Sequence, residues 1–225
     1  GLSCTTCASP SASPSATTSY IVTGTDVYGC FNKDTVKITV NNTITVNAGA
    51  DQSICVGDAA KLSATGAPSF TWSPATGLSC TTCYNPTATP ATTTTYVVSG
   101  TDTNGCSNTD TITVTVHALP LIDAGADESI CNGSVTTVSA SGASAYNWTP
   151  ATGLACPTCA SSKVSTSATT TYTVKGTDTY GCSDSDSVTI TVKPTPVIIA
   201  GPNATICFGN AVTIKANGAQ SYSWL

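Results

Sequence analysis

The sequence predicts an all-β protein built as a tandem array of small β-sandwich domains, and three observations carry this prediction. The first is a repeat of 76 residues: the segment at residues 1–7 returns at 77–83 and again at 153–159, without a gap. The second is a series of short β-branched runs separated by turn residues, with no window of helical periodicity. The third is four cysteines in each repeat. A unit of this length can bury its own core, unlike solenoid repeats of about 20–50 residues.

Strand and turn signals divide each repeat into short elements. In the repeat that begins at residue 43, alternating β-branched residues predict a final pair of strands, and Asn104-Gly105 between them is a strong hairpin signal. Gly and Pro fall between the shorter runs, as expected of turns that join short strands. The predicted strands are residues 43–46, 60–64, 70–72, 94–100 and 111–116.

The repeat length predicts two complete domains, at residues 43–118 and 119–194. Residues 1–42 carry only the C-terminal strands of a domain, and residues 195–225 only the N-terminal strands. A half sandwich would leave long unpaired edges, so we expect the sequence to be a window on a longer polypeptide. The alternative is a polymer in which the last segment of one subunit completes the first segment of the next. Short connectors that contain proline predict a semi-rigid rod.

Composition excludes several classes of partner. Only 8% of residues are charged, and seven Lys with no Arg, against twelve acidic residues, give a net charge of −5. No basic surface is therefore expected that could neutralise the phosphates of a nucleic acid. The longest apolar run is far shorter than the roughly 18 residues of a membrane-spanning helix, so no membrane span is expected in this segment.

Two aromatic positions recur in every repeat and are predicted to lie in the core. Trp72 falls on the third predicted strand, where immunoglobulin-like sandwiches place a buried Trp. Tyr96 enters a later strand after a polar run, in the manner of a tyrosine corner. Stacking of the Trp on a sugar is the alternative, and it needs an exposed ring. The predicted core residues are Trp72, Trp148, Trp224, Tyr20, Tyr96 and Tyr172.

The four cysteines of a repeat are predicted to form two structural disulfides, as is common in small exported domains. A redox site is disfavoured because the Cys80-x-x-Cys83 spacing lacks the strand-to-helix context of thioredoxin motifs. A zinc site is disfavoured because zinc modules usually supply two close cysteine pairs and this repeat has one. The cysteines expected in disulfides are Cys4, Cys7, Cys55, Cys80, Cys83, Cys106, Cys131, Cys156, Cys159 and Cys182.

Two pairings remain open for Cys55. The favoured one joins Cys80 with Cys83 as a loop clasp and leaves Cys55 to pair with Cys106. In a standard sandwich, however, Cys55 and Cys106 would lie at opposite ends, too far apart for a disulfide. The alternative joins Cys55 to Cys182 of the following repeat, which would staple neighbouring domains together.

Polar chemistry is sparse, and no enzyme activity is predicted. His117 is the only histidine and is not repeated, and no nucleophile, base and orienting acid recur together. Asp26, Asp102 and Asp178 recur before a Gly-Cys pair and are candidates for calcium contacts, although an Asp in this setting is more often a turn former. No other cofactor is expected.

Several motifs together resemble a known class of repeat. SICVGD at residues 53–58, FTWSPATGLSCTTC at 70–83, TTTY at 93–96 and TNGC at 103–106 resemble the PKD-like or immunoglobulin-like repeats of large Bacteroidota surface proteins. Such repeats look like the stalks of gliding-motility adhesins and of other proteins exported by the type IX secretion system. The resemblance implies a secreted, cell-surface protein.

The resemblance also implies a modification. An Asp followed by Thr or Ser and then Val or Ile recurs in each repeat and looks like the O-glycosylation signal of that bacterial group. The hydroxyl-bearing residues are Thr35, Thr111 and Ser187.

Two functions are therefore expected, in order of preference. The first is structural: a segment of an extracellular filament or adhesin stalk that gives reach and mechanical strength, with further repeats of the same or identical chains as partners. The second is a multivalent module that binds glycans or surfaces.

Overall fold

The computed structural model describes residues 1–225 and is all-β, with sixteen strands and no helix. No helix is therefore available that could cross a membrane. The chain divides into two compact units, Gly1–His117 and Ala118–Leu225, which are described in turn.

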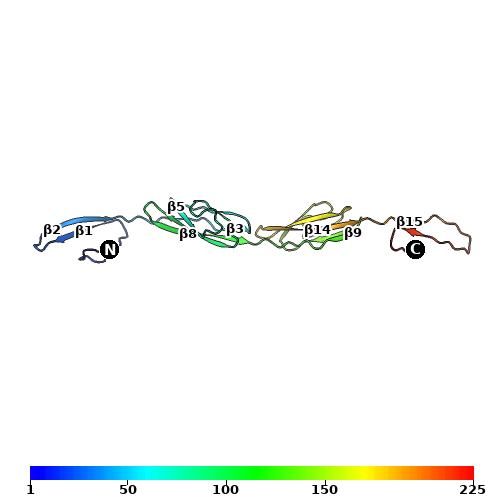
Figure 1. Cartoon of the computed structure of the whole chain (residues 1–225), viewed down its shortest axis with the longest axis horizontal. Helices are drawn as coiled ribbons and strands as arrows, with labels where there is room; N and C mark the ends of the chain where they lie inside the picture. Colours follow the sequence, from blue (N-terminus) through cyan, green and yellow to red (C-terminus); the bar gives the residue numbers. More distant parts are fainter. The chain divides into compact units, whose positions relative to one another are not determined.

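The first unit contains a hairpin followed by a complete sandwich (Figure 1). The sandwich has a four-stranded sheet in the order β3-β8-β7-β5 and a two-stranded sheet of β4 and β6. The strands are β1 (Thr18–Thr25), β2 (Phe31–Ile38), β3 (Gln52–Cys55), β4 (Ala60–Lys61), β5 (Ser69–Ser73), β6 (Thr87–Ala88), β7 (Thr94–Thr101) and β8 (Ser107–His117).

One side of the larger sheet faces the smaller sheet, and the core lies between them. Alternate residues of β7 and β8 are buried, including Tyr96, Val98 and Ile112, because successive side chains of a strand point to opposite faces. Leu62 and Ala88 cover them from the side of the smaller sheet. This is an immunoglobulin-like β-sandwich with a core of its own.

The second unit repeats this design. Its larger sheet has the order β11-β13-β14-β9, its smaller sheet pairs β10 with β12, and its core is separate. A short pair, β15 with β16, follows. The strands are β9 (Glu128–Cys131), β10 (Thr136–Ser139), β11 (Ala145–Thr149), β12 (Ser161–Val164), β13 (Thr170–Thr177), β14 (Ser183–Lys193), β15 (Ile199–Ala200) and β16 (Ala216–Asn217).

The all-β class and the terminal hairpin are confirmed, since β7 and β8 pair antiparallel around residues 102–106. Several details differ from the predicted strands. Residues 43–46 form no strand, and residues 60–64 form one only at Ala60–Lys61. Neither β3 nor the two-residue strand β6 was predicted. The division into four segments at residues 42, 118 and 194 stays a prediction.

Two predicted core residues do not lie in a core. Trp224 is 54% exposed and Tyr20 is half-buried, whereas Trp72 and Tyr96 are fully buried. The reason is that β15 and β16 pair only with each other, and β1 and β2 likewise, so neither residue lies between two layers of a sandwich.

Candidate functional site

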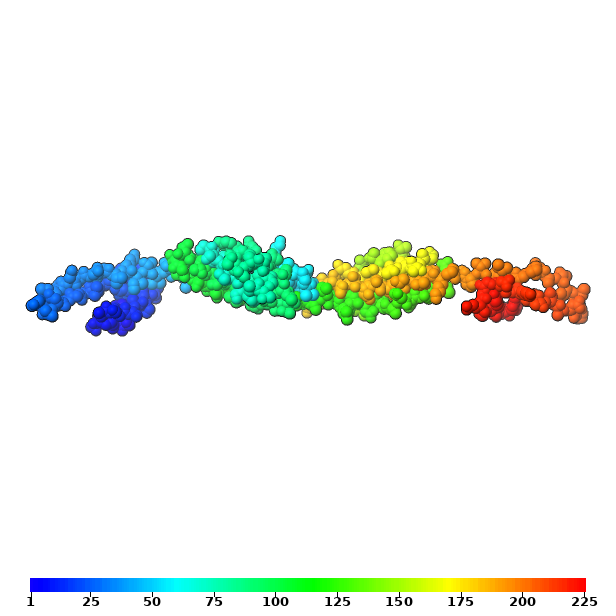
Figure 2. Space-filling view, viewed as in Figure 1, coloured from blue at the N-terminus to red at the C-terminus, as the bar shows by residue number.

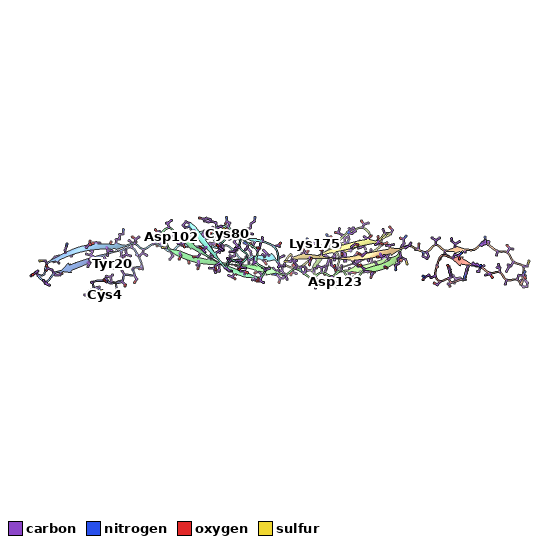
Figure 3. The ribbon with its side chains drawn as sticks, viewed as in Figure 1. Cys4, Tyr20, Cys80, Asp102, Asp123 and Lys175 are labelled. Carbon is purple, nitrogen blue, oxygen red and sulfur yellow. A yellow bond between two sulfur atoms is a disulfide. The ribbon has the colours of Figure 1, made fainter.

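The Cys80-Thr81-Thr82-Cys83 loop is built around the buried Trp72. The Trp72 backbone amide donates to the Thr81 carbonyl at 2.7 Å, and the indole Nε1 donates to the Cys83 carbonyl at 3.0 Å. A disulfide joins Cys80 and Cys83, whose Cα atoms are 6.0 Å apart. Figure 3 marks Cys80 on this loop. The disulfide therefore closes the loop, and the carbonyl oxygen of Cys83 in this loop accepts the indole N–H of Trp72.

The second complete repeat has the same clasp. The Trp148 amide donates to the Pro157 carbonyl at 2.8 Å, and its Nε1 donates to the Cys159 carbonyl at 3.0 Å. A disulfide joins Cys156 and Cys159. Cys4 and Cys7 form a third such disulfide. Since Trp72 and Trp148 are 2% and 1% exposed, neither ring can stack on a sugar.

The recurring Tyr ties its strand to the segment before the clasp. The Tyr96 hydroxyl donates to the Thr76 carbonyl at 3.0 Å, and the Tyr172 hydroxyl donates to the Thr152 carbonyl at the same distance. Burial raises the pKa of Tyr96, so the phenol stays protonated and remains a donor. The arrangement is that of a tyrosine corner.

The recurring Asp102 shapes the hairpin turn between β7 and β8 (Figure 3). Its Oδ1 accepts the backbone amides of Asn104 and Cys106, both at 2.8 Å. Asp26 and Asp178 make the same pair of bonds in their own turns. This is the geometry of a turn former. No group of three or more His, Cys, Asp or Glu side chains is arranged to hold a metal ion.

A second recurring carboxylate bonds to a segment 62 residues earlier. Asp110 Oδ2 accepts the amide of Ala48 at 2.8 Å. The pKa of Asp110 is lowered because its carboxylate accepts the amides of Ala48 and of Thr111. Asp186 is equivalent: it accepts the amide of Ala124 at 2.8 Å, and its pKa is lowered in the same way.

These bonds belong to a row of contacts that follows β8 along its whole length. The segment before and within β3 runs parallel to β8, and the β3–β8 pairs extend from Gln52↔Val114 to Cys55↔His117. In Figure 1, β3 lies alongside β8. The other bonds of the row are Asn108 Nδ2 to the Ile44 carbonyl (2.8 Å), the Ala48 amide to Asp110, the Thr113 amide to Asp51 Oδ1 (2.8 Å), and the Val56 amide to the His117 carbonyl (2.8 Å).

The second repeat has the same row beside β14. Its parallel pairs run from Ile190↔Glu128 to Lys193↔Cys131. The remaining bonds are the Ala124 amide to Asp186, the Thr189 amide to Asp127 Oδ1 (2.8 Å), and the Asn132 amide to the Lys193 carbonyl (2.9 Å).

The predicted pairing of Cys55 with Cys106 is wrong. Cys106 is a free thiol, and so is Cys131, whose predicted partner within its repeat was Cys182. Cys55 lies beside His117 at the end of β8, whereas Cys106 directly precedes the start of that strand. Eleven residue steps at about 3.3 Å separate Cys106 from His117, so the two cysteines lie roughly 36 Å apart, and a disulfide needs Cα atoms within about 7 Å.

The three hydroxyl-bearing positions of the Asp-Thr/Ser motif, Thr35, Thr111 and Ser187, are all exposed on strands. They are accessible to a modifying enzyme, and the glycosylation remains a proposal.

Comparison with known proteins found no matching protein family and no matching curated protein. Solved structures are similar at low identity. Hemolin, an insect immune protein, is 12% identical with a TM-score of 0.37, over 78% of this chain and 56% of that chain. Eight N-terminal Ig domains of the Down Syndrome Cell Adhesion Molecule are 16% identical with a TM-score of 0.33, over 92% of this chain and 37% of that one.

A third similar structure is a Ca²⁺-stabilized adhesin with which an Antarctic bacterium binds ice. It is 13% identical with a TM-score of 0.39, over 83% of this chain and 60% of that chain. These TM-scores all lie below 0.5, so the fold class rests on the sheets and cores described above.

Proposed function

We propose that this chain is a structural segment of an extracellular filament or adhesin stalk, whose domains resist extension. The observation that carries the proposal is the parallel row of bonds between the entering segment and the last strand of each complete repeat. Export to the cell surface, through the type IX route that the sequence resemblance implies, is part of the proposal, as is O-glycosylation at Thr35, Thr111 and Ser187.

The geometry of the row decides how a repeat responds to tension. The chain enters the first complete repeat near Ile44 and leaves it at His117, and the two bonded segments run in the same direction. Tension therefore pulls the entering segment and β8 in opposite directions along their common axis. All of the bonds are loaded together in shear, whereas an antiparallel pair pulled from one end would open one bond at a time.

The clasp and the turn support the same role. The Cys80–Cys83 disulfide, together with the bonds from Trp72 to the Thr81 and Cys83 carbonyls, stabilises this loop. The recurring Asp and Tyr side chains both bond to backbone groups. The partners expected for such a segment are further repeats of the same kind.

Single-molecule stretching tests the proposal. A Cys55→Ser background removes any disulfide that could join the repeats, and each of the two complete repeats should then unfold in its own event. Each event should release up to about 270 Å of chain, at roughly 3.3–3.6 Å per residue. Adding Asp51→Ala and Val56→Pro, at two exposed positions, removes two bonds of the row in the first repeat only.

One of the two events should then fall to a clearly lower force, and the other should stay unchanged as an internal control. Tyr84→Phe is the matched variant outside the row, since it removes the bond from the Tyr84 hydroxyl to the Pro68 carbonyl. It should leave both forces nearly unchanged. If the double variant leaves both forces unaltered, or if Tyr84→Phe lowers the force as much, the row does not carry the load.

A further inference from the structure

The two complete repeats differ at three places along the segment that enters each of them. At the first two places, an amide side chain of the first repeat is replaced by the corresponding acid 76 residues later. An amide side chain can donate a hydrogen bond to a carbonyl oxygen, whereas a carboxylate only accepts. The replacements therefore keep the shape of the side chain and remove a donor.

The first difference lies where the chain enters a repeat. Asn108 Nδ2 donates to the Ile44 carbonyl at 2.8 Å, while Asn108 Oδ1 accepts the next amide in the chain. Asp184, the equivalent residue of the second repeat, also accepts the next amide through its Oδ1. It cannot donate to the carbonyl of Pro120, which takes the place of Ile44, because a carboxylate carries no hydrogen.

The second difference lies between the two sheets. Gln52 Nε2 on β3 donates to the Lys61 carbonyl on β4 at 2.7 Å, so a backbone group of the smaller sheet holds the entering segment of the first repeat. Glu128 is the equivalent residue on β9, and its carboxylate accepts from the Thr136 hydroxyl. That bond joins two side chains, both of which lose rotamer freedom when it forms. We therefore expect it to hold the segment less firmly.

The third difference is a hollow of about 250 Å³ beside the entering segment of the second repeat. It lies between that segment, β10 and β14, and Ala124, Val138 and Val188 are among the residues that line it. Leu62 and Ile112, which are fully buried, replace Val138 and Val188 in the first repeat, and each is larger by one carbon atom. The atoms that line the hollow lose van der Waals contacts on that side.

Other core positions favour the second repeat. Three of its buried residues are larger than those they replace. They are Ile122 in place of Val46, Val164 in place of Ala88, and Ile190 in place of Val114. The two cores therefore contain similar amounts of apolar side chain, and the difference between the repeats lies in the bonds that hold the entering segment.

We infer that the second complete repeat unfolds at a lower force than the first, so that rising tension lengthens the chain in two separate steps. The bonds from Asn108 and Gln52 hold the segment that tension pulls, and the second repeat divides the same tension among fewer such bonds. The first repeat would keep its fold while the second extends. This inference deepens the proposed function and rests on it for its mechanical meaning.

Exchange of the amide and acid side chains between the repeats tests this order. In the same Cys55→Ser background, the two repeats should unfold at clearly different forces. Asn108→Asp with Gln52→Glu should lower the higher of the two forces. Asp184→Asn with Glu128→Gln should raise the lower one, because both donors are restored.

Asn85→Asp is the matched control, since it makes the same chemical change at an exposed position outside the entering segment, and it should leave both forces unaltered. Equal forces for the two unmodified repeats would overturn the inference. So would a loss at the lower force, instead of the higher one, in Asn108→Asp with Gln52→Glu, or an equal loss in Asn85→Asp. The proposed function is tested separately by Asp51→Ala with Val56→Pro, whose effect does not depend on which repeat unfolds first.

Hydrogen exchange provides a readout without tension. The Ala48 and Ala124 amides donate to equivalent carboxylates at the same distance of 2.8 Å, so their exchange rates compare the two entering segments directly. After correction for neighbouring residues, the Ala124 amide should exchange several-fold faster, because a segment held by fewer bonds opens more often. Asp184→Asn should slow the exchange of Ala124 and leave that of Ala48 unchanged. Equal rates for the two amides in the unmodified chain would also overturn the inference.

Discussion

The complete repeats and the terminal segments contain the same residues in the same register, yet their side chains differ in burial. Trp72 is 2% exposed, whereas Trp224, two repeats later, is 54% exposed. Val98 on β7 is fully buried, whereas Val22 at the equivalent position of β1 is 62% exposed. In the space-filling view, the first complete repeat, in cyan and green, is thick, whereas the blue segment is thin (Figure 2).

The difference lies in the second layer. β1 and β2 pair only with each other, while β7 and β8 also pair with β5 and β3 and face the smaller sheet. Beside Trp224 is a hollow of about 460 Å³, lined among others by Ile214 and Val212. An apolar pattern thus specifies which side chains enter a core, but burial requires both layers of the sandwich.

The largest expected effect contrasts the two Trp positions. Trp148→Ala should lower the stability of the second unit by about 3–5 kcal/mol, because it removes a fully buried ring and the bond to the Cys159 carbonyl. Trp224→Ala should change stability by less than about 0.5 kcal/mol, because the ring is half exposed. Differential scanning calorimetry measures both. Equal losses would mean that the terminal segment contains a packed core after all.

Local signals were sufficient for much of this fold. Asn104-Gly105 predicted the β7–β8 hairpin, and the Trp and Tyr positions predicted core residues wherever both layers are present. Strand length was less predictable. The Leu62 and Ala64 amides donate to the Pro86 and Tyr84 carbonyls, but Pro86 has no N–H to return a bond, so the regular ladder stops at Lys61.

The spacing of residues in the sequence does not predict the long-range contacts. The bonds from the Ala48 amide to Asp110 and from the Thr113 amide to Asp51 each join residues 62 positions apart. Nothing in the sequence near Asp110 distinguishes a carboxylate that bonds to a distant amide from one that faces solvent. The parallel register places Cys55 and Cys106 at opposite ends of β8, as expected for a standard sandwich, and so excludes the favoured cysteine pairing.

A smaller effect is expected at the recurring Tyr. Tyr96→Phe should destabilise the first repeat by about 1–2 kcal/mol, because the Thr76 carbonyl loses the hydroxyl that donates to it in a part-buried site. Tyr20→Phe, the matched variant on β1, should have almost no effect, since that ring is only half-buried. Urea unfolding of both variants measures the contrast. Similar losses for the two would show that the hydroxyl bond is not the source of the stabilisation.

The smallest effect is expected from pH. Because the folded-state pKa values of Asp110 and Asp186 are lowered, each carboxylate contributes stability that is complete above its unfolded pKa of about 3.9 and is lost as the pH falls through the lowered folded value. The melting temperature of the chain should therefore decline below about pH 4, and the double variant Asp110→Asn/Asp186→Asn should decline less steeply over that range. Asp34→Asn is the control from the terminal segment, where the carboxylate accepts only the adjacent Thr35 amide, and its acid profile should match that of the unmodified chain. The melting temperature of the double variant could instead decline below pH 4 as steeply as that of the unmodified chain. Other carboxylates would then be responsible for the decline, and the two bonds to the entering segments would contribute little to the difference between complete and terminal repeats.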